Sequence, residues 1–187
     1  MSPFSVMLWL WAIWALSWFL AAAWSNRTEA RLGLTSELLS RVLTVAGFAL
    51  LFVTDRHGGP GPKLWETPTV PGWCLVGLEL AGFLFCWWAR IHLGRMWSIS
   101  VTRKVNHHIV DTGPYALVRH PIYTGIITAA AALAAQRGTL LAFAGLPLVV
   151  LAFWTKARLE ERFLRAQLGP EAYDAYAHRT GMLFPGL

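Results

Sequence analysis

The sequence predicts an all-α integral membrane protein, a bundle of about five transmembrane helices with a polar site at one membrane face. Of the 187 residues, 56% are hydrophobic and only 14% are charged, and the mean hydropathy is positive. A soluble globule of this size needs more polar surface than this composition supplies. Long apolar stretches recur along the chain, and the charged residues gather between them. Together these observations place the chain in a bilayer.

The first predicted span is residues 4–24, which carry no charged residue. At about 1.5 Å per residue they are long enough to cross about 30 Å of hydrocarbon. A cleaved signal peptide is the alternative. However, no basic region precedes the apolar stretch, and the stretch is too long for the hydrophobic region of a signal peptide. Further spans are predicted at residues 38–54, 70–89, 121–135 and 139–154, the last two short and rich in alanine.

The last two predicted spans form a tight antiparallel hairpin, because only residues 136–138 separate them. Their outer ends therefore meet at the opposite membrane face. The segment that enters the hairpin carries Gly-Pro-Tyr at 113–115 and Arg-His-Pro at 119–121, and the segment that leaves it carries Glu-Glu at 160–161. The topology predicts that these polar motifs lie together.

These motifs resemble those of the membrane-embedded S-adenosylmethionine (SAM) methyltransferases. That superfamily holds the isoprenylcysteine carboxyl methyltransferases and the phospholipid N-methyltransferases, and its signatures are RHPxYxG and EE. The chain has RHPIYTG at 119–125 and EE at 160–161. The resemblance also includes Leu-Gly-Arg-Met-Trp-Ser at 93–98, His107, Thr-Gly-Pro-Tyr at 112–115 and Phe-Pro-Gly-Leu at 184–187. It implies SAM as cofactor and a SAM-binding half over about residues 93–187 of a single domain, 1–187.

The cofactor-binding residues implied by the resemblance are His107, Tyr115, Arg119, His120, Pro121, Tyr123, Gly125, Glu160 and Glu161. Their residue types suit the cofactor. A proline at the first position of a helix leaves nearby backbone N–H groups free to bind a carboxylate. Tyrosine rings can face a sulfonium, and glycine lets a ligand or a neighbouring helix approach closely. By analogy with the family, the glutamates bind the ribose hydroxyls or the amino group.

Simpler roles are open for several of these residues. Arg119 can be a membrane-interface anchor, and Glu160 can pair with Lys156, or Glu161 with Arg165, at a spacing of four. Adjacent glutamates point about 100° apart on a helix, so one of the two is expected to face the cofactor squarely. We favour Glu160.

The acceptor is expected to be lipid-like or prenylated, because a bundle with its site at the membrane interface suits an apolar tail with a nucleophilic head. A carboxylate nucleophile needs only a cation, and Arg95 and Arg179 are the candidates. An amine or a thiol needs a base, and His107 is the candidate. Candidate substrate contacts are Glu79, Trp97 and Tyr176, with hydrogen bonding to a neighbouring helix as the alternative for Glu79.

Carboxyl O-methylation of the isoprenylcysteine type is therefore the leading functional prediction. Phospholipid or other amine N-methylation, and methylation of a small thiol, are the alternatives, and a membrane scaffold or small transporter is the non-enzyme alternative. The family resemblance also implies an arginine three residues after Arg179, where this chain has Met182. That difference weakens the carboxylate prediction without affecting the SAM site.

An amphipathic tail helix is predicted after Gly169-Pro170, with Tyr173, Tyr176 and Arg179 on one face. This face is suited to cover the site, and plain packing of the tyrosines is the alternative. The histidines have no spacing typical of a zinc site, so no metal is expected. Cys74 and Cys86 are expected to be inert.

The distribution of basic residues predicts an orientation. With the N-terminus outside, 13 of the 16 Lys and Arg residues fall in inner segments. SAM is a cytoplasmic metabolite, which independently places the site and the C-terminus inside, in a bacterial inner membrane. The net charge of +6 is then expected to meet membrane lipids rather than nucleic acid.

Overall fold

The computed structural model describes residues 1–22, 28–31, 34–53, 62–94, 97, 102–104 and 109–186. In chain order the elements are α1 (Pro3–Ala22), β1 (Thr28–Arg31), α2 (Leu34–Phe52), α3 (Thr69–Leu93), β2 (Thr102–Lys104), the 3-10 turn η2 (Gly113–Ala116), α4 (Pro121–Arg137), α5 (Leu140–Leu168) and α6 (Pro170–Arg179). The predicted helical bundle is confirmed. The short antiparallel ribbon of β1 and β2 was not predicted.

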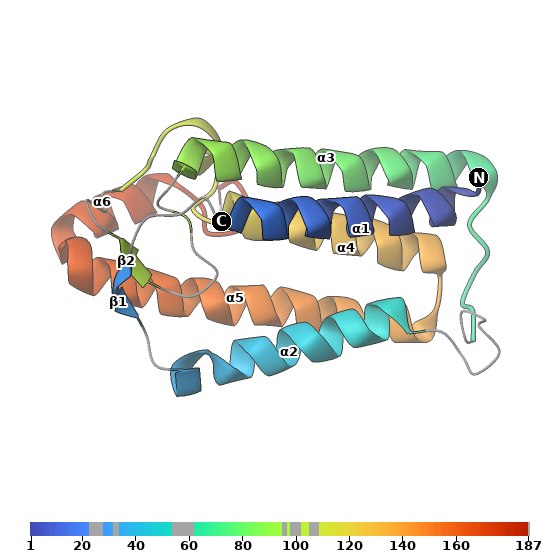
Figure 1. The fold of residues 1–187 in the computed structure, drawn as a ribbon, viewed down its shortest axis with the longest axis horizontal. Helices are drawn as coiled ribbons and strands as arrows, with labels where there is room; N and C mark the ends of the chain where they lie inside the picture. The colour runs from blue at the N-terminus through green and yellow to red at the C-terminus, as the bar shows by residue number, and fades with distance from the viewer. Residues whose placement is uncertain are drawn as a thin grey trace.

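The long helices lie side by side in two layers, with α1, α3 and α4 in one and α2 and α5 in the other (Figure 1). The most extensive contacts are between α2 and α5 and between α3 and α4. Because α4 also contacts α1, α2 and α5, it joins the layers and most of its residues are buried. Its alanine-rich sequence suits this place, since small side chains let neighbouring helices approach closely.

Four of the described helices, α1, α2, α3 and α5, are long and apolar enough to cross a membrane. The sequence predicted five spans, and α4 is the exception. Its 17 residues rise about 25 Å, which is less than the hydrocarbon thickness of about 30 Å. Helix α4 runs from the polar end of the bundle to the opposite end, enclosed by its longer neighbours (Figure 1).

The connection between α4 and α5 lies at one end of the bundle, opposite to α6 and the strands (Figure 1). Gly138 ends α4 in the left-handed conformation, with φ of 60°, and its N–H donates to the carbonyl of Ala134 at 3.0 Å. Thr139 caps α5 by accepting from the N–H of Ala142. The predicted hairpin is thus present, and both ends that carry the polar motifs lie at the far end.

Helix α5 is much longer than its predicted span. The sequence prediction ended the span at residue 154, whereas the helix continues to Leu168. The hydrophobic pattern stops at 154, but good helix formers follow until Gly169-Pro170 ends the helix. At 29 residues it rises about 44 Å, so its last turns reach beyond the hydrocarbon and carry Glu160 and Glu161.

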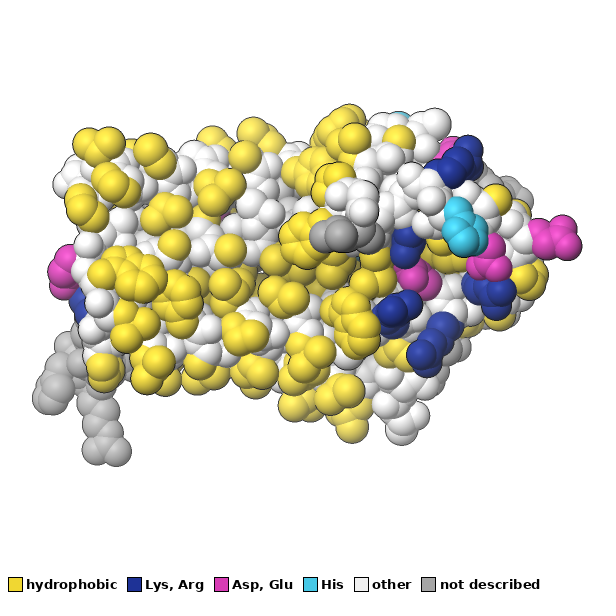
Figure 2. Space-filling model, turned by 180° about the vertical axis from the view of Figure 1, so that it is seen from behind, with side chains coloured by type: hydrophobic (Ala, Val, Ile, Leu, Met, Phe, Trp, Pro, Cys, Tyr) yellow, Lys and Arg dark blue, Asp and Glu magenta, His cyan; other side chains and the backbone are white. Residues whose placement is uncertain are grey.

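The surface divides along the bundle axis. Figure 2 shows hydrophobic side chains covering the length of the bundle, with the charged side chains gathered mainly at the end formed by α6. Large apolar side chains such as Trp9, Leu16, Val45 and Leu84 are more than half exposed. So large an exposed apolar surface is typical of contact with lipid. The protein is therefore an integral membrane protein with one predominantly polar end.

Candidate functional site

The segment after α6 covers the N-terminal end of α4. The N–H groups of Arg119 and His120 donate to the carbonyls of Gly181, at 2.8 Å, and Met182, at 3.1 Å. These two donors lie at the helix cap, where the sequence predicts free N–H groups for a cofactor carboxylate, but both are occupied by the chain itself. The hydroxyl of Thr124 adds a third bond to this segment, at 2.7 Å to the carbonyl of Leu183.

Helix geometry leaves further backbone donors in the first turn of α4 without a partner in the helix. Pro121 is buried at its first position and has no N–H group. The next two residues, Ile122 and Tyr123, have N–H groups that no carbonyl of the same helix can reach. An anion at this cap would meet these donors rather than those of Arg119 and His120.

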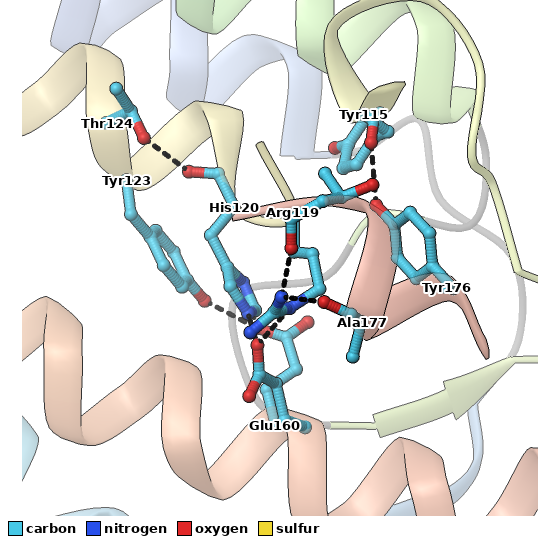
Figure 3. A network of polar contacts seen from close by, with 10 residues as sticks. Tyr115, Arg119, His120, Tyr123, Thr124, Glu160, Tyr176 and Ala177 are labelled. Atoms are coloured by element: carbon cyan, nitrogen blue, oxygen red, sulfur yellow. Dashed lines mark hydrogen bonds and ion pairs between the residues drawn. The ribbon is translucent and has the colours of Figure 1, made fainter. Parts of the chain in front are cut away.

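Arg119 links three helices through its guanidinium. Its Nε donates to Oε1 of Glu161 on α5 at 2.7 Å, and its Nη1 donates to the carbonyl of Ala177 on α6 at 2.9 Å and to that of Thr180 (Figure 3). The side chains of Arg119 and Glu161 are each only 12% exposed. Arg119 thus holds the C-terminal segment against α4 and α5.

His120 lies between the two glutamates. Its Nε2 is 3.3 Å from Oε1 of Glu161, and its Nδ1 is 3.7 Å from Oε2 of Glu160. The imidazole stacks on the ring of Tyr123, with centroids 5.2 Å apart and planes only 2° from parallel. The Tyr123 hydroxyl donates to Oε2 of Glu160 at 2.8 Å. The RHP and EE motifs therefore meet in one network, as the hairpin topology predicted (Figure 3).

Glu160 and Glu161 have different surroundings although they are adjacent. Glu161 is held by Arg119 and His120, whereas Glu160 has the tyrosine hydroxyl as its close partner. The Glu160 side chain is also more exposed, at 31% against 12%. A carboxylate accepts several hydrogen bonds, so Glu160 has the greater capacity for a ligand.

All four tyrosines of the chain lie at this end of the bundle, on η2, at the start of α4 and on α6. The Tyr176 hydroxyl donates to the carbonyl of Tyr115 at 2.8 Å, and the rings of Tyr173 and Tyr176 meet edge to face. Burial raises the pKa of Tyr115, Tyr173 and Tyr176, and the nearby carboxylates raise the pKa of Tyr115 and Tyr173 further. The phenols are therefore neutral hydrogen-bond donors throughout the physiological range.

Arg179 does not share the surroundings of the two tail tyrosines. Tyr173 and Tyr176 are buried, whereas the Arg179 side chain is 68% exposed and reaches Asp111 at 3.4 Å. Arg179 therefore lies at the rim of the cluster. It bonds neither the glutamates nor His120 among the contacts of the described residues.

Gly125 lies where α4 touches α3. A side chain there would run into the carbonyl of Gly82 and, at 2.5 Å, into the sulfur of Cys86. Cys86 itself is buried and donates to the carbonyl of Ile122 at 3.3 Å. Of the two predicted uses of Gly125, the close approach of a neighbouring helix is the one that the geometry accounts for.

Two candidate substrate contacts lie outside this network. Glu79 is fully buried in the middle of α3 beside Trp11, and neither of its oxygens forms a hydrogen bond with another described residue. Cys86, the α3 residue that contacts the start of α4, lies seven residues further along, so Glu79 is about 10 Å away from that contact along the helix. Trp97 is buried under the guanidinium of Arg90, whose carbon is 4.5 Å from the ring centroid.

Two further charged residues lie close to the site, of which sequence reasoning named Lys156 only as a possible partner of Glu160 and did not name Glu37. Lys156 places its ammonium 5.6 Å from the centroid of the Tyr123 ring, one helical turn before Glu160. Glu37, in the first turn of α2, is 2% exposed and pairs with Arg41 at 2.7 Å. The spacing of four from Lys156 to Glu160 already placed Lys156 near the site, but nothing in the sequence indicates that α2 reaches this end.

Arg95 and His107, the predicted cation and base, lie outside the described residues. Within the described part of the chain, no group of three or more His, Cys, Asp or Glu residues is arranged to hold a metal ion. The described site is therefore a network of carboxylates, imidazole, phenols and basic groups.

Comparison with known proteins supports the motif analysis. Residues 75–166 match the model of the isoprenylcysteine carboxyl methyltransferase (ICMT) family. This segment runs from α3 through η2 and α4 to the end of α5 that carries the glutamates. The family resemblance inferred from the motifs is therefore confirmed.

Two named relatives are similar over longer stretches. The cobalt-zinc-cadmium resistance protein CzcN of Cupriavidus metallidurans is 31% identical over 162 residues, which are 86% of this chain and 66% of CzcN. The nickel-cobalt-cadmium resistance protein NccN of Alcaligenes xylosoxydans xylosoxydans is 29% identical over 116 residues, which are 62% of this chain and 53% of NccN. The chain thus spans just under two thirds and about half of the lengths of these relatives.

Proposed function

We propose that this integral membrane chain, whose residues 75–166 carry the sequence of the isoprenylcysteine carboxyl methyltransferase family, is a SAM-dependent methyltransferase that acts on a lipid-like acceptor. The observation that carries the proposal is the network in which His120 and Tyr123 at the start of α4 meet Glu160 on α5. It lies at the polar end of a bundle whose flanks are apolar (Figure 2).

The residues of this network fit SAM. Glu160 has unused acceptor capacity for a ribose hydroxyl or an ammonium group, and the N–H groups of Ile122 and Tyr123 suit a carboxylate. The Tyr123 ring, stacked on His120 and near Lys156, forms an aromatic wall. When bound, SAM supplies the methyl group as an electrophile. Arg119 and Glu161 would act one step away by fixing the C-terminal segment.

The acceptor is proposed to carry its nucleophile on an apolar tail, with a carboxylate as the leading choice. Methylation of a carboxylate forms an ester with no proton to remove, whereas a protonated amine or a thiol must first lose a proton to a base. The cation for a carboxylate would come from Arg179 at the rim or from Arg95. Met182 stands where the family resemblance implies an arginine. It packs against the apolar core, so this position supplies no third cation. Amine N-methylation and thiol S-methylation are therefore retained as alternatives.

Equilibrium binding of SAM to the purified protein in detergent tests the proposal. The wild-type chain should bind SAM, and Glu160→Gln should weaken binding by about 1–3 kcal/mol, the cost of removing a partner from a charged or polar group. Glu66→Gln is the matched control, because Glu66 is a 78% exposed carboxylate paired with Lys63 at the opposite end. The proposal fails if the wild-type chain does not bind SAM. Equal affinity in the wild-type and Glu160→Gln proteins would remove Glu160 from the site.

The names of the two relatives add a second candidate, a part in resistance to metal ions. A source strain that lacks the gene can be complemented with the wild-type chain or with the Glu160→Gln chain and grown with cobalt, zinc or cadmium. If resistance depends on methyl transfer, the wild-type chain restores growth and the Glu160→Gln chain does not. If both chains restore growth, a role in metal resistance does not depend on the proposed methyl transfer.

A further inference from the structure

One face of α5 carries apolar and basic side chains in sequence along the helix. Leu151 and Trp154 are 44% and 41% exposed, and Arg158 and Arg162 follow, both exposed. Steps of three or four residues keep all of them on one side of the helix. Glu160 lies two residues from both arginines, a rotation of about 200°, so this face points away from the proposed SAM site.

The change from apolar to basic side chains falls where α5 leaves the hydrocarbon. The 28 residues of α5 from Leu140 to Gln167 rise about 42 Å, more than the roughly 30 Å of hydrocarbon, so the basic end of the helix reaches beyond it. The guanidinium carbon of Arg158 lies 5.3 Å from the centroid of the Trp154 ring. A tryptophan with a stacked arginine is typical of the headgroup level of a bilayer.

Within the described part of the chain, neither Arg158 nor Arg162 forms an ion pair. Arg165, one turn further, differs because its guanidinium binds both oxygens of Asp174, each at 2.7 Å. Arg158 and Arg162 therefore present two neighbouring planar forks, a geometry that suits phosphate oxygens.

We propose that Trp154, Arg158 and Arg162 form a binding site for an anionic phospholipid, with the phosphate held by the two arginines. The acyl chains would lie against Leu151 and the apolar side chains before it. Two positive charges favour a headgroup with a net negative charge, because the cation of a choline headgroup would be repelled. The site is separate from the proposed SAM site and does not depend on methyltransferase activity.

Native mass spectrometry of the full chain in detergent tests this site, with phosphatidylglycerol and phosphatidylcholine as probes. The wild-type protein should retain phosphatidylglycerol in preference to phosphatidylcholine. The double variant Arg158→Gln with Arg162→Gln should lower retention of phosphatidylglycerol by roughly thirtyfold, since each of the two basic residues near an anionic surface contributes on the order of 1 kcal/mol. Arg165→Gln is the control and should retain the lipid as the wild type does.

The following outcomes of these measurements would overturn the proposal. They are unchanged retention in the double variant, an equal loss in Arg165→Gln, and displacement of the lipid by millimolar inorganic phosphate, which would indicate a site for a free anion. The double Arg→Lys variant at positions 158 and 162 keeps the charge and guards against an effect of misfolding. It should retain more phosphatidylglycerol than the glutamine variant, and equal loss in both would contradict a charge-based site.

Discussion

Glu160 and Glu161 are adjacent on α5, yet their contacts suggest different tasks. Glu161 neutralises Arg119, which in turn holds the carbonyls at the end of α6. Glu160 bonds Tyr123 and keeps a larger exposed fraction. The helix geometry explains the difference, since a turn of about 100° brings one carboxylate toward the C-terminal segment and leaves the other beside the tyrosine.

Glu161→Gln should therefore lower stability more than Glu160→Gln. The first change leaves the Arg119 guanidinium without its countercharge at 12% exposure, which should cost about 1–3 kcal/mol of unfolding free energy. The second changes a more exposed group and should cost under about 1 kcal/mol. Denaturant unfolding in a fixed detergent measures both. Equal losses would show that Glu161 does not clamp the C-terminal segment.

The buried tyrosines give the site a pH dependence on the alkaline side. The folded protein raises the pKa of Tyr115, Tyr173 and Tyr176 above the ordinary value of 10.0, first through burial. A raised pKa means that the folded state holds these protons more tightly than the unfolded chain does. Their contribution to stability is then complete below about pH 10 and is lost as the pH rises above it.

The thermal unfolding midpoint, measured from pH 8 to pH 11 in detergent, should be nearly constant at first and fall above about pH 10. In Tyr176→Phe, which removes one of the shifted groups, the fall should be shallower. Tyrosinate absorbance provides the second reading. Ionisation of all tyrosines near pH 10 with no change in the midpoint would contradict their burial.

At the scale of single residues, the sequence was informative where a motif is local. His120, Tyr123 and Glu160 were predicted from short runs and do meet in the structure. The occupied N–H groups of Arg119 and His120 were not foreseen, because the return of the chain past α6 leaves no local signature. The position of Glu37 was missed for the same reason, since it depends on how α2 packs against α5.

At the scale of helices, α3 and α4 approach each other closely at Gly82 and Gly125. Gly125→Ala should destabilise the protein by about 1–3 kcal/mol, because the added methyl group has no room beside Gly82 and Cys86. Gly77→Ala is the matched control on α3, where nothing lies within 4 Å of the added atom. Thermal unfolding should separate the two variants. Similar midpoints would contradict the packing of α3 on α4.

The helix boundaries show what hydropathy can and cannot predict. The pattern that ended the fifth predicted span at residue 154 marks the limit of the apolar side chains, whereas the backbone stays helical to Leu168. Likewise, alanine counts as apolar, so the pattern does not reveal that most of α4 is buried by protein. Hydropathy reports the polarity of side chains, so it shows neither where a helix continues beyond the membrane nor whether neighbouring helices cover it.

At the scale of the whole molecule, the charged end should face the cytoplasm with the C-terminus. The 13 basic residues on that side against 3 on the other predict this orientation. Reporter fusions after residue 24 and at the C-terminus should read cytoplasmic, and a fusion at Arg137 should read external. A C-terminus outside the cytoplasm would remove the proposed site from its cofactor.

Transfer of labelled methyl from SAM to a lipid extract tests the central claim most directly. The purified wild-type chain and the Glu66→Gln control should move label into the lipid phase at similar rates. Glu160→Gln should lower the rate roughly tenfold or more at limiting SAM, in line with a loss of about 1–3 kcal/mol in binding. Transfer that Glu160→Gln leaves unchanged, or no transfer by the wild-type chain to any lipid fraction, would contradict the account.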